Sequence, residues 1–403
     1  MRIVLVSQEY PPETAHGGIA TQTYLKAHGL ASLGHEVLVI SHAIDHKRSE
    51  YRDGDVSVTR IPGFEDRFSI GTEAARWVTY SVAVAEEISR LNAKSPIQII
   101  DFPEWACESY IHLLNRQEWN HIPTVIQLHG PLVMFAHTMG WPEIDSELYR
   151  VGTAMEGTCL RLADAVFSSS SCSANWCAAH YGLDRDEIPI LHTGIDCELF
   201  RPVDVPKAKR PTIIFVGKLE RNKGIAILLE ASLQLTKDFP DLQVRILGSG
   251  NPVLIGELRA QAIAAGAPDL LDLQGFVGRE DLPAQLSSAH VFAAPSEYEG
   301  GPGFVYLEAM ACGLPVIACE GNGASEVITN AKHGYLVPPK NSDALVTALR
   351  ELLSDRRKRE EMGGNGRLYV REKANTKDRI RKLEAFYSGV ACCSLAASAR
   401  TSA

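Results

Sequence analysis

The sequence predicts a two-domain α/β protein in which each domain is a doubly wound parallel sheet. The chain has 403 residues, more than a single hydrophobic core usually organises. Short β-rich runs alternate with helical patterns along most of its length, which is typical of parallel sheets covered by helices on both faces. A Pro- and charge-rich run without periodicity, residues 201–211, interrupts this alternation near the middle of the chain.

The first half of the chain, residues 1–200, is expected to form the N-terminal domain. Its helix over 20–33 ends at Gly34, a natural C-terminal stop, and lies between two strands as in a β-α-β unit. A second helix is expected over 72–91, where apolar residues recur at helical spacing. The predicted strands are 3–7, 36–41, 97–101, 124–128 and 165–169.

The second half repeats the alternation after the predicted linker at 201–211. Residues 212–370 are expected to form the C-terminal domain, with a helix over 224–236 and strands at 212–216, 244–247, 272–274, 291–294 and 316–318. A final helix over 376–387 is basic on one side and apolar on the other. We therefore expect 371–390 to pack back on the N-terminal domain and 391–403 to form a flexible tail. Two facing α/β domains would bind a ligand at the carboxyl ends of their strands.

Bulk composition disfavours several classes of partner. The formal net charge of -9 gives no global reason to bind nucleic acid. The apolar run at the N-terminus is too short for a signal peptide, and no segment is long enough to span a bilayer, so a cytoplasmic location is expected. The nine cysteines are scattered and odd in number, which indicates reduced thiols. Peripheral membrane contact and oligomeric state are left open.

The stretch over 294–318 carries the most chemical information. It consists of a strand, a Gly-rich acidic loop, a helix starting near Gly303, and a Gly-Leu-Pro stop before another strand. A helix N-terminus preceded by glycines offers free N–H groups that suit a phosphate or sugar hydroxyls. Glu308, one helical step from Phe304, could accept hydrogen bonds from the vicinal hydroxyls of a ribose. The alternative is a tight turn with Glu299 and Glu308 both solvated.

A second informative stretch runs from a buried strand into a basic loop and a helix, over 213–224. Lys218 and Lys223 could reach the same anion, placing two positive charges on a diphosphate without a metal. The alternative is a basic loop exposed to solvent. No metal-ligand spacing stands out among the histidines and cysteines.

In the first half, two strands end in residues that suit a sugar ligand. His129 follows the strand at 124–128, with a strand-capping histidine as the alternative. An acidic and aromatic cluster at 101–105 suits an acceptor, although core packing of its aromatic residues is an equal alternative. The same alternative applies to Trp119 and Trp141.

Taken together, these motifs resemble the retaining glycosyltransferases of family 4, also called glycosyl transferases group 1, which have the GT-B fold of two Rossmann-like domains. The resemblance covers nearly the whole chain. Its most specific match is Glu308-Ala309-Met310-Ala311-Cys312-Gly313-Leu314-Pro315-Val316. Further matches are Glu9-Tyr10-Pro11-Pro12, the Gly17-Gly18 pair, residues 34–37, 192–196 and 200–202, and Gly334-Tyr335-Leu336-Val337-Pro338.

The resemblance implies a role for each matching residue. Glu308 would hold the nucleotide ribose, Lys218 and Lys223 the donor phosphates, and Gly17 or Gly18 the distal phosphate from the opposite domain. His129 would contact the transferred sugar or its reacting end. The catalytic residues implied are thus His129, Lys218, Lys223 and Glu299, and the donor-binding residues are Gly17, Gly18, Gly217, Lys218, Lys223, Gly301, Gly303, Phe304, Val305 and Glu308.

The reaction implied is transfer of a hexose-type sugar from a nucleotide diphosphate sugar to a hydroxyl acceptor, which could be a glycan, a lipid-linked group or a small molecule. The anomeric configuration would be retained, with the leaving phosphate oxygen helping to deprotonate the acceptor. No metal and no cofactor is expected, because the donor is itself a substrate. The sequence does not name the donor base, the sugar or the acceptor.

Three departures from the family pattern bear on the site. Residues 300–307 separate Glu299 from Glu308, one more than the usual seven, so that Gly300 stands at the usual glutamate position. A one-residue bulge would let Glu299 still reach the sugar, and Glu297 is a weaker candidate. Lys218 replaces a common Arg and so loses bidentate geometry on a phosphate. His192, to which no role is assigned, replaces a common Asn. The altered spacing supports one alternative function, a catalytically impaired nucleotide- or glycan-binding protein on the same fold.

Overall fold

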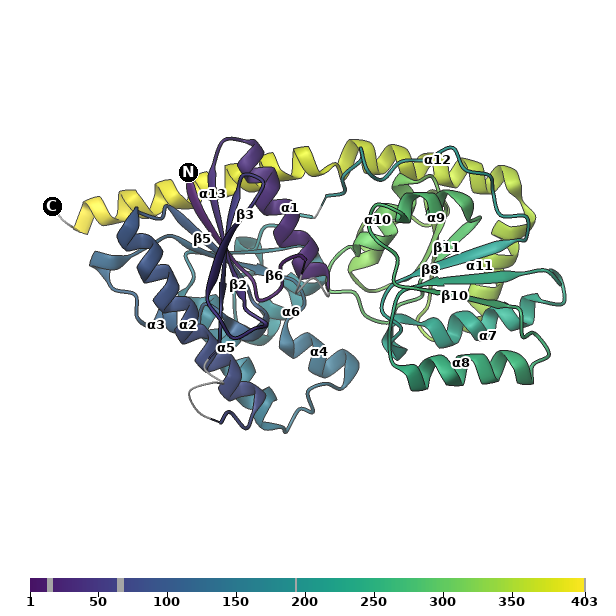
Figure 1. Ribbon diagram of the computed structural model, residues 1–403, viewed down its shortest axis with the longest axis horizontal. Helices are drawn as coiled ribbons and strands as arrows, with labels where there is room; N and C mark the ends of the chain where they lie inside the picture. Colours follow the sequence, from purple (N-terminus) through teal and green to yellow (C-terminus); the bar gives the residue numbers. More distant parts are fainter. Residues whose placement is uncertain (13–16, 64–68, 193, 402–403) are drawn as a thin grey trace. The chain divides into compact units, whose positions relative to one another are not determined.

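The computed structural model describes residues 1–12, 17–63, 69–192 and 194–401 of the chain, which forms two compact units (Figure 1). Unit 1 comprises Met1–Thr193 together with Thr376–Ala403, and unit 2 comprises Gly194–Asn375. Each unit is a parallel α/β domain with its own sheet and helices. The two-domain α/β expectation is therefore confirmed.

The sheet of unit 1 has seven strands in the order β3-β4-β2-β1-β5-β6-β7. Every neighbouring pair is parallel except β3 and β4, which are antiparallel. The inner strands are fully buried apolar runs, as expected of a sheet covered on both faces. The bounds are β1 (Arg2–Val6), β2 (Glu36–His42), β3 (Ser49–Asp53), β4 (Val56–Ile61), β5 (Ile99–Pro103), β6 (Thr124–Leu128) and β7 (Ala165–Ser168).

The helices of unit 1 follow the strands in a βαβ pattern, with sequence signals at their ends. Thr72, Ser146 and Ser170 each accept a hydrogen bond from a first-turn N–H group, which fixes the starts of three helices. The bounds are α1 (Gly18–Ser32), α2 (Glu73–Lys94), α3 (Tyr110–Leu114), α4 (Leu132–Met139), α5 (Glu147–Leu162) and α6 (Ser171–Tyr181), with 3₁₀ turns η1 (Trp105–Cys107), η2 (Glu118–Asn120) and η3 (Arg185–Glu187).

The C-terminal helix, α13 (Thr376–Thr401), belongs to unit 1 although it follows unit 2 in the chain. Ile380, Leu383 and Tyr387 are buried in the same apolar cluster as β1 and β2. Gly29 of α1 leaves the space for this contact, since a Cβ there would lie 2.6 Å from Ile380 Cγ1. The helix also continues to Thr401, through most of the range expected to form a flexible tail.

The sheet of unit 2 has six strands in the order β10-β9-β8-β11-β12-β13, all parallel. Its bounds are β8 (Thr212–Val216), β9 (Gln243–Leu247), β10 (Leu271–Gly275), β11 (Val291–Ala293), β12 (Val316–Cys319) and β13 (Gly334–Val337). The helices are α7 (Ile225–Leu235), α8 (Pro252–Ala264), α9 (Leu282–Ser288), α10 (Phe304–Ala311), α11 (Ser342–Ser354) and α12 (Arg356–Lys373), with 3₁₀ turns η4 (Arg221–Lys223) and η5 (Gly323–Glu326).

The expected linker at 201–211 does not separate the units, because the structure packs this segment onto unit 2. The Val203 N–H donates to Ser287 Oγ over 3.1 Å, and the Arg210 guanidinium caps three carbonyl groups, those of Asp241, Leu242 and Asp269. The boundary falls instead at Gly194, so the second unit begins earlier than the predicted 212 and ends at Asn375. The Pro- and charge-rich composition of this segment is typical of a linker, but polar contacts fix it to unit 2.

Every strand expected from the sequence is present within about two residues, and two are matched at both ends, 124–128 and 212–216. The hairpin of β3 and β4 was missed. Its outer strand is charged and mostly exposed, so that it lacks the apolar alternation by which strands were recognised. Within the described residues, no helix joins the length and the apolar character that crossing a bilayer requires.

Candidate active site

The switch point of the unit 2 sheet lies at its central strand β8, which pairs with β9 on one side and β11 on the other. Ligands of open α/β sheets bind outside the carboxyl ends of the strands at such a point. The two loops singled out in the sequence begin there, after Val216 of β8 and after Ala293 of β11. Topology therefore brings the two motifs together.

The loop after β8 presents the two predicted lysines differently. Lys218 is exposed and has no ion pair among the described residues. Lys223 lies at the end of η4, where its Nζ is 2.9 Å from Glu299 Oε1 of the other loop. Gly224 follows at φ 74°, and a Cβ there would lie 2.0 Å from the Pro295 carbonyl oxygen. Only glycine permits this approach, which holds the two loops together.

The loop after β11 leads Glu299 to the start of α10. A Cβ on Gly303, which precedes the helix at φ 69°, would lie 3.8 Å from Glu299 Oε2. The N–H groups of the first turn of α10, from Phe304 onward, have no partner within the helix. Glu297 instead lies 3.1 Å from Lys340 Nζ in a separate ion pair. Of the two glutamates, Glu299 is the one beside Lys223.

Glu308 is buried inside α10, where burial raises its pKa and the neighbouring Arg279 lowers it. Arg279 Nη1 lies 3.1 Å from Glu308 Oε1, and the Arg279 guanidinium stacks over the ring of Phe200, 4.9 Å from its centre. Sequence reasoning missed Arg279. The sequence could have indicated Arg279 by its position in the loop after β10, which lies at the same edge of the sheet as Lys218.

In unit 1, His129 follows β6 and its backbone is fixed by a buried carboxylate. The N–H groups of His129 and Gly130 both donate to Glu104 Oε1, over 2.7 and 2.5 Å. The His129 ring has no hydrogen-bond partner among the described residues, so the strand-capping alternative is not observed. Burial, with the ammonium group of Lys26, lowers the pKa of His129 to about 3. The imidazole is therefore neutral at physiological pH.

Three buried carboxyl groups lie at this end of unit 1. Burial raises the pKa of Glu104 to about 7 and those of Glu108 and Glu156 to about 8. Oε2 of Glu104 and Oε2 of Glu108 have no partner among the described atoms. Between Glu104 and Glu108, Ala106 and Cys107 adopt left-handed backbone angles, φ 58° and 51°. Such strained non-glycine residues concentrate at functional sites.

The acidic and aromatic cluster over 101–105 divides between core and surface. Phe102 is buried, as the packing alternative expected. Trp105 contacts Phe135 with ring centres 5.3 Å apart and stacks on the half-exposed Trp141 at 6.1 Å. Trp119 is almost fully exposed and takes no part in this stack. An aromatic surface thus lies next to Glu104, whereas Trp119 is separate.

Asp101 is the centre of a buried polar network in unit 1. The Lys26 ammonium donates to Asp101 and to Gln127 Oε1, and the Tyr387 hydroxyl of α13 donates to the same Asp101 oxygen. Lys26 is also the charge that depresses the pKa of His129. The C-terminal helix is thereby connected to the edge that carries His129.

The remaining predicted residues are placed as follows. Gly17 precedes α1 and Gly18 begins it, in unit 1, while residues 13–16 lie outside the described residues. Gly217, at φ 154°, follows β8, and Gly301 and Val305 flank the start of α10. His192 bonds through Nδ1 to the Ser169 carbonyl oxygen at 2.9 Å, a contact within unit 1. Across the described ranges, no group of three or more His, Cys, Asp or Glu side chains is arranged to hold a metal ion.

Two family models match this chain, and together they span nearly its whole length. The model described as "Glycosyltransferase Family 4" matches residues 16–199, and that described as "Glycosyl transferases group 1" matches residues 197–369. The second match contains the loops that follow β8 and β11 in unit 2.

Named relatives match over most of their length. A GDP-mannose-dependent alpha-(1-6)-phosphatidylinositol monomannoside mannosyltransferase of Mycolicibacterium smegmatis is 28% identical, covering 96% of this chain and 98% of the relative. A glycogen synthase of Mycobacterium tuberculosis is 26% identical, covering 88% of this chain and 86% of the relative.

Solved structures share the fold. Sucrose-phosphate synthase from Thermosynechococcus elongatus superposes with a TM-score of 0.82 at 23% identity, over 97% of this chain and 99% of that one. Anabaena HepE in complex with UDP superposes with a TM-score of 0.74 at 17% identity, over 96% of this chain and 100% of that one.

Proposed function

This chain belongs to the group 1 glycosyltransferases of the GT-B fold, and on that premise we propose that it transfers a hexosyl group with retention of anomeric configuration. The donor is a nucleoside diphosphate sugar and the acceptor a hydroxyl group. Bond by bond, the anomeric carbon leaves the phosphate oxygen and joins the acceptor oxygen, and the acceptor proton passes to the leaving phosphate.

The observation that carries the proposal is the meeting of Lys223, Glu299 and the start of α10 at one edge of unit 2. The diphosphate would lie against the free N–H groups of the first turn of α10, where the helix dipole favours an anion. Lys223 and the exposed Lys218 would neutralise the charge that develops on the leaving phosphate. Two ammonium groups and a helix end can supply this stabilisation without a metal.

The two glutamates are proposed to hold the two sugars of the donor. Glu308 would accept hydrogen bonds from the ribose hydroxyls, and the Arg279 charge beside it would partly offset the burial that raises the pKa of this carboxyl. Glu299, 2.9 Å from the Lys223 ammonium, would contact the transferred hexose. Its position near Gly303, at the start of α10, supports this role in spite of the extra residue between the glutamates.

In unit 1, His129 is proposed to contact the transferred sugar as a neutral group. Because the pKa of His129 is about 3, its imidazole is neutral. It would hydrogen-bond a hydroxyl group and would bring no positive charge to the donor. Gly17 and Gly18, at the start of α1, would bind the distal phosphate through backbone N–H groups.

GDP-mannose is the first donor to test, because relatives that match over nearly their full length are named as GDP-mannose-dependent. UDP-glucose is the comparator. For the acceptor, the same relatives are named for a phosphatidylinositol monomannoside and others for D-inositol 3-phosphate, so inositol-containing hydroxyl compounds form the first panel.

The decisive experiment follows product formation from each donor with the acceptor panel in EDTA, with the anomeric configuration read by NMR. We expect a product of retained configuration from one donor, and none from Glu299→Ala. An inverted product would overturn the retaining mechanism, and a product that requires added divalent cation would overturn metal independence.

The second candidate, a nucleotide- or glycan-binding protein without transfer activity, is favoured by the altered spacing of Glu299 and Glu308. It predicts nucleotide binding that is lost in Glu308→Ala, but neither transfer nor slow hydrolysis of any donor. Donor hydrolysis by the native chain that disappears in Lys223→Ala would rule it out.

A further inference from the structure

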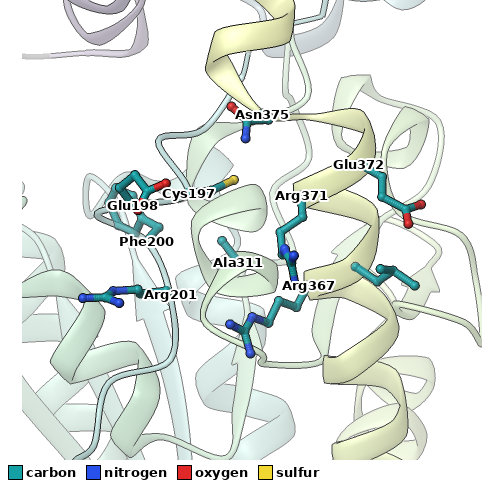
Figure 2. Close-up of a pocket in the computed structure, with 10 residues that line it drawn as sticks. Cys197, Glu198, Phe200, Arg201, Ala311, Arg367, Arg371, Glu372 and Asn375 are labelled. Atoms are coloured by element: carbon teal, nitrogen blue, oxygen red, sulfur yellow. The ribbon is translucent and has the colours of Figure 1, made fainter.

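Unit 2 contains a pocket that lies away from the proposed donor site. The pocket has a volume of about 450 Å³ and is formed by three segments: residues 197–201, the last residue of α10, and the final turns of α12 (Figure 2). This volume is within the range of small-molecule sites. The pocket includes Ala311 at the C-terminal end of α10, whereas the proposed donor site is at the N-terminal end. The two sites are thus about 10 Å apart along this helix.

Three arginines line the pocket without a partner. Arg367 and Arg371 lie one turn apart on α12, and Arg201 comes from the segment that enters the unit. In the part of the chain that the structure describes, none of the three forms an ion pair. Two other exposed arginines of this unit do form ion pairs, since Arg356 lies 2.7 Å from Glu360 and Arg350 lies 2.9 Å from Asp238.

The arrangement of the two helix arginines is unfavourable by itself. Like charges four residues apart on a helix repel each other, and no acid separates Arg367 from Arg371 here. Two carboxylates also line the pocket, Glu198 and Glu372, but neither is paired with an arginine, and Glu372 points away from the two helix arginines in Figure 2. The lining therefore keeps a net positive charge that an anion would neutralise.

We propose that this pocket binds a phosphate monoester dianion, as carried by a sugar phosphate or by free phosphate. The guanidinium fork matches two phosphate oxygens at once, and charge-assisted bonds of this kind are stronger than neutral ones. The pocket exceeds the size of a phosphate alone, which leaves room for a sugar ring against Leu368 and Asn375.

The pocket also has a direct physical connection to the donor site. Phe200 forms part of its wall and carries the stacked Arg279, whose other contact is Glu308. A ligand that shifts the Phe200 ring would change the position of the Arg279 charge beside Glu308. Binding at the two sites would then be reciprocally coupled.

The test is calorimetric titration of the full chain at fixed ionic strength with glucose 6-phosphate, inorganic phosphate, and neutral glucose as control. The native chain and Lys223→Ala, which impairs the proposed donor site, should bind the phosphate ester alike. Arg367→Gln and Arg371→Gln should each weaken binding by on the order of tenfold or more. Arg357→Gln, the same change on the same helix outside the pocket, should not.

The possible results distinguish phosphate binding in this pocket from phosphate binding elsewhere on the chain. No binding of either phosphate by the native chain would overturn the proposal, as would binding that is lost in Lys223→Ala but kept in Arg371→Gln. Binding of both phosphates supports a phosphate-only ligand, and tighter binding of the ester supports a sugar phosphate. If a helix variant fails to fold, as judged by circular dichroism, Arg201→Gln tests the same pocket from outside α12.

Discussion

The ionisable groups at the carboxyl ends of the two sheets differ in their exposure to solvent and in their pKa values. In unit 2 three of the groups are reachable from solvent: Lys218 is exposed, and the side chains of Lys223 and Glu299 keep 27% and 16% of their surface, whereas Glu308 is buried. In unit 1 Glu104 and Glu108 are buried with raised pKa values, and His129 is neutral. The first arrangement suits a charged diphosphate and the second suits neutral hydroxyl groups. The difference agrees with the proposal that unit 2 binds the donor and unit 1 the acceptor.

Removing one reachable charge from unit 2 should have the largest effect. We expect Lys223→Ala to lower kcat/KM by roughly 10²- to 10³-fold, because it deletes a cation aimed at the leaving phosphate. Initial rates, with the donor that gives product in the assay proposed above, measure this fall in kcat/KM. Lys237→Ala, an exposed lysine of the same unit that forms no ion pair with the described residues, is the matched control. Equal losses in both variants would contradict a specific role for Lys223.

The buried carboxyls of unit 1 should make its stability depend on pH. The pKa of Glu108 is about 8 in the folded chain and 4.5 in the reference state, so the unfolded chain loses this proton first as the pH rises. Its contribution to stability is complete below pH 4.5 and is lost as the pH rises through 8. Between pH 6 and 8.5 we expect the free energy of unfolding to fall by on the order of 2 kcal/mol from this group.

The measurement is urea unfolding followed by tryptophan fluorescence. All five tryptophans lie in unit 1, so the signal reports that unit alone. Glu108→Gln, which keeps an oxygen to accept the Gln8 N–H, should reduce the pH dependence by the share of Glu108 and leave that of Glu104 and Glu156. Glu118→Gln, an exposed position of the same unit, should leave it unchanged. A pH dependence as steep in Glu108→Gln as in the native chain would refute the assignment of a share to this carboxyl, because Glu104 and Glu156 account only for the remainder.

The C-terminal helix should contribute a smaller stabilisation, confined to unit 1. Tyr387→Phe removes the hydroxyl that donates to buried Asp101, which should cost about 1 kcal/mol in the same fluorescence assay. Tyr335→Phe removes a comparable tyrosine-to-carboxylate bond in unit 2, to Glu351. Tyr335→Phe should not change the urea concentration at which tryptophan fluorescence reports unfolding of unit 1. A shift of similar size in both would show that the two units unfold together.

The sequence predicted the parts of this site that depend on short-range patterns. Val216 and Ala293 end apolar runs before glycine-containing loops, so strand ends and the start of α10 could be located. The partner of Glu308 could not be predicted, because Arg279 reaches it only through tertiary folding. The same applies to Lys26, Asp101 and Tyr387, which three separate elements bring together.

For residues 201–211 the local sequence pattern predicted a linker between the domains that the structure does not have. Proline and charge are typical of linkers, but Arg210 and the Val203 N–H are used here to anchor the segment to unit 2. Composition reports which residues avoid helix and strand. It does not report whether their backbone is held by distant partners.

The central claim, that unit 2 holds the donor diphosphate by reachable charges, is tested most directly by calorimetric titration of the full chain with GDP and UDP in EDTA. We expect binding of one nucleotide by the native chain and by Lys237→Ala, and binding weakened by on the order of tenfold or more in Lys223→Ala and Glu308→Ala. Undiminished binding in both of these variants, or no binding of either nucleotide by the folded native chain, would contradict it.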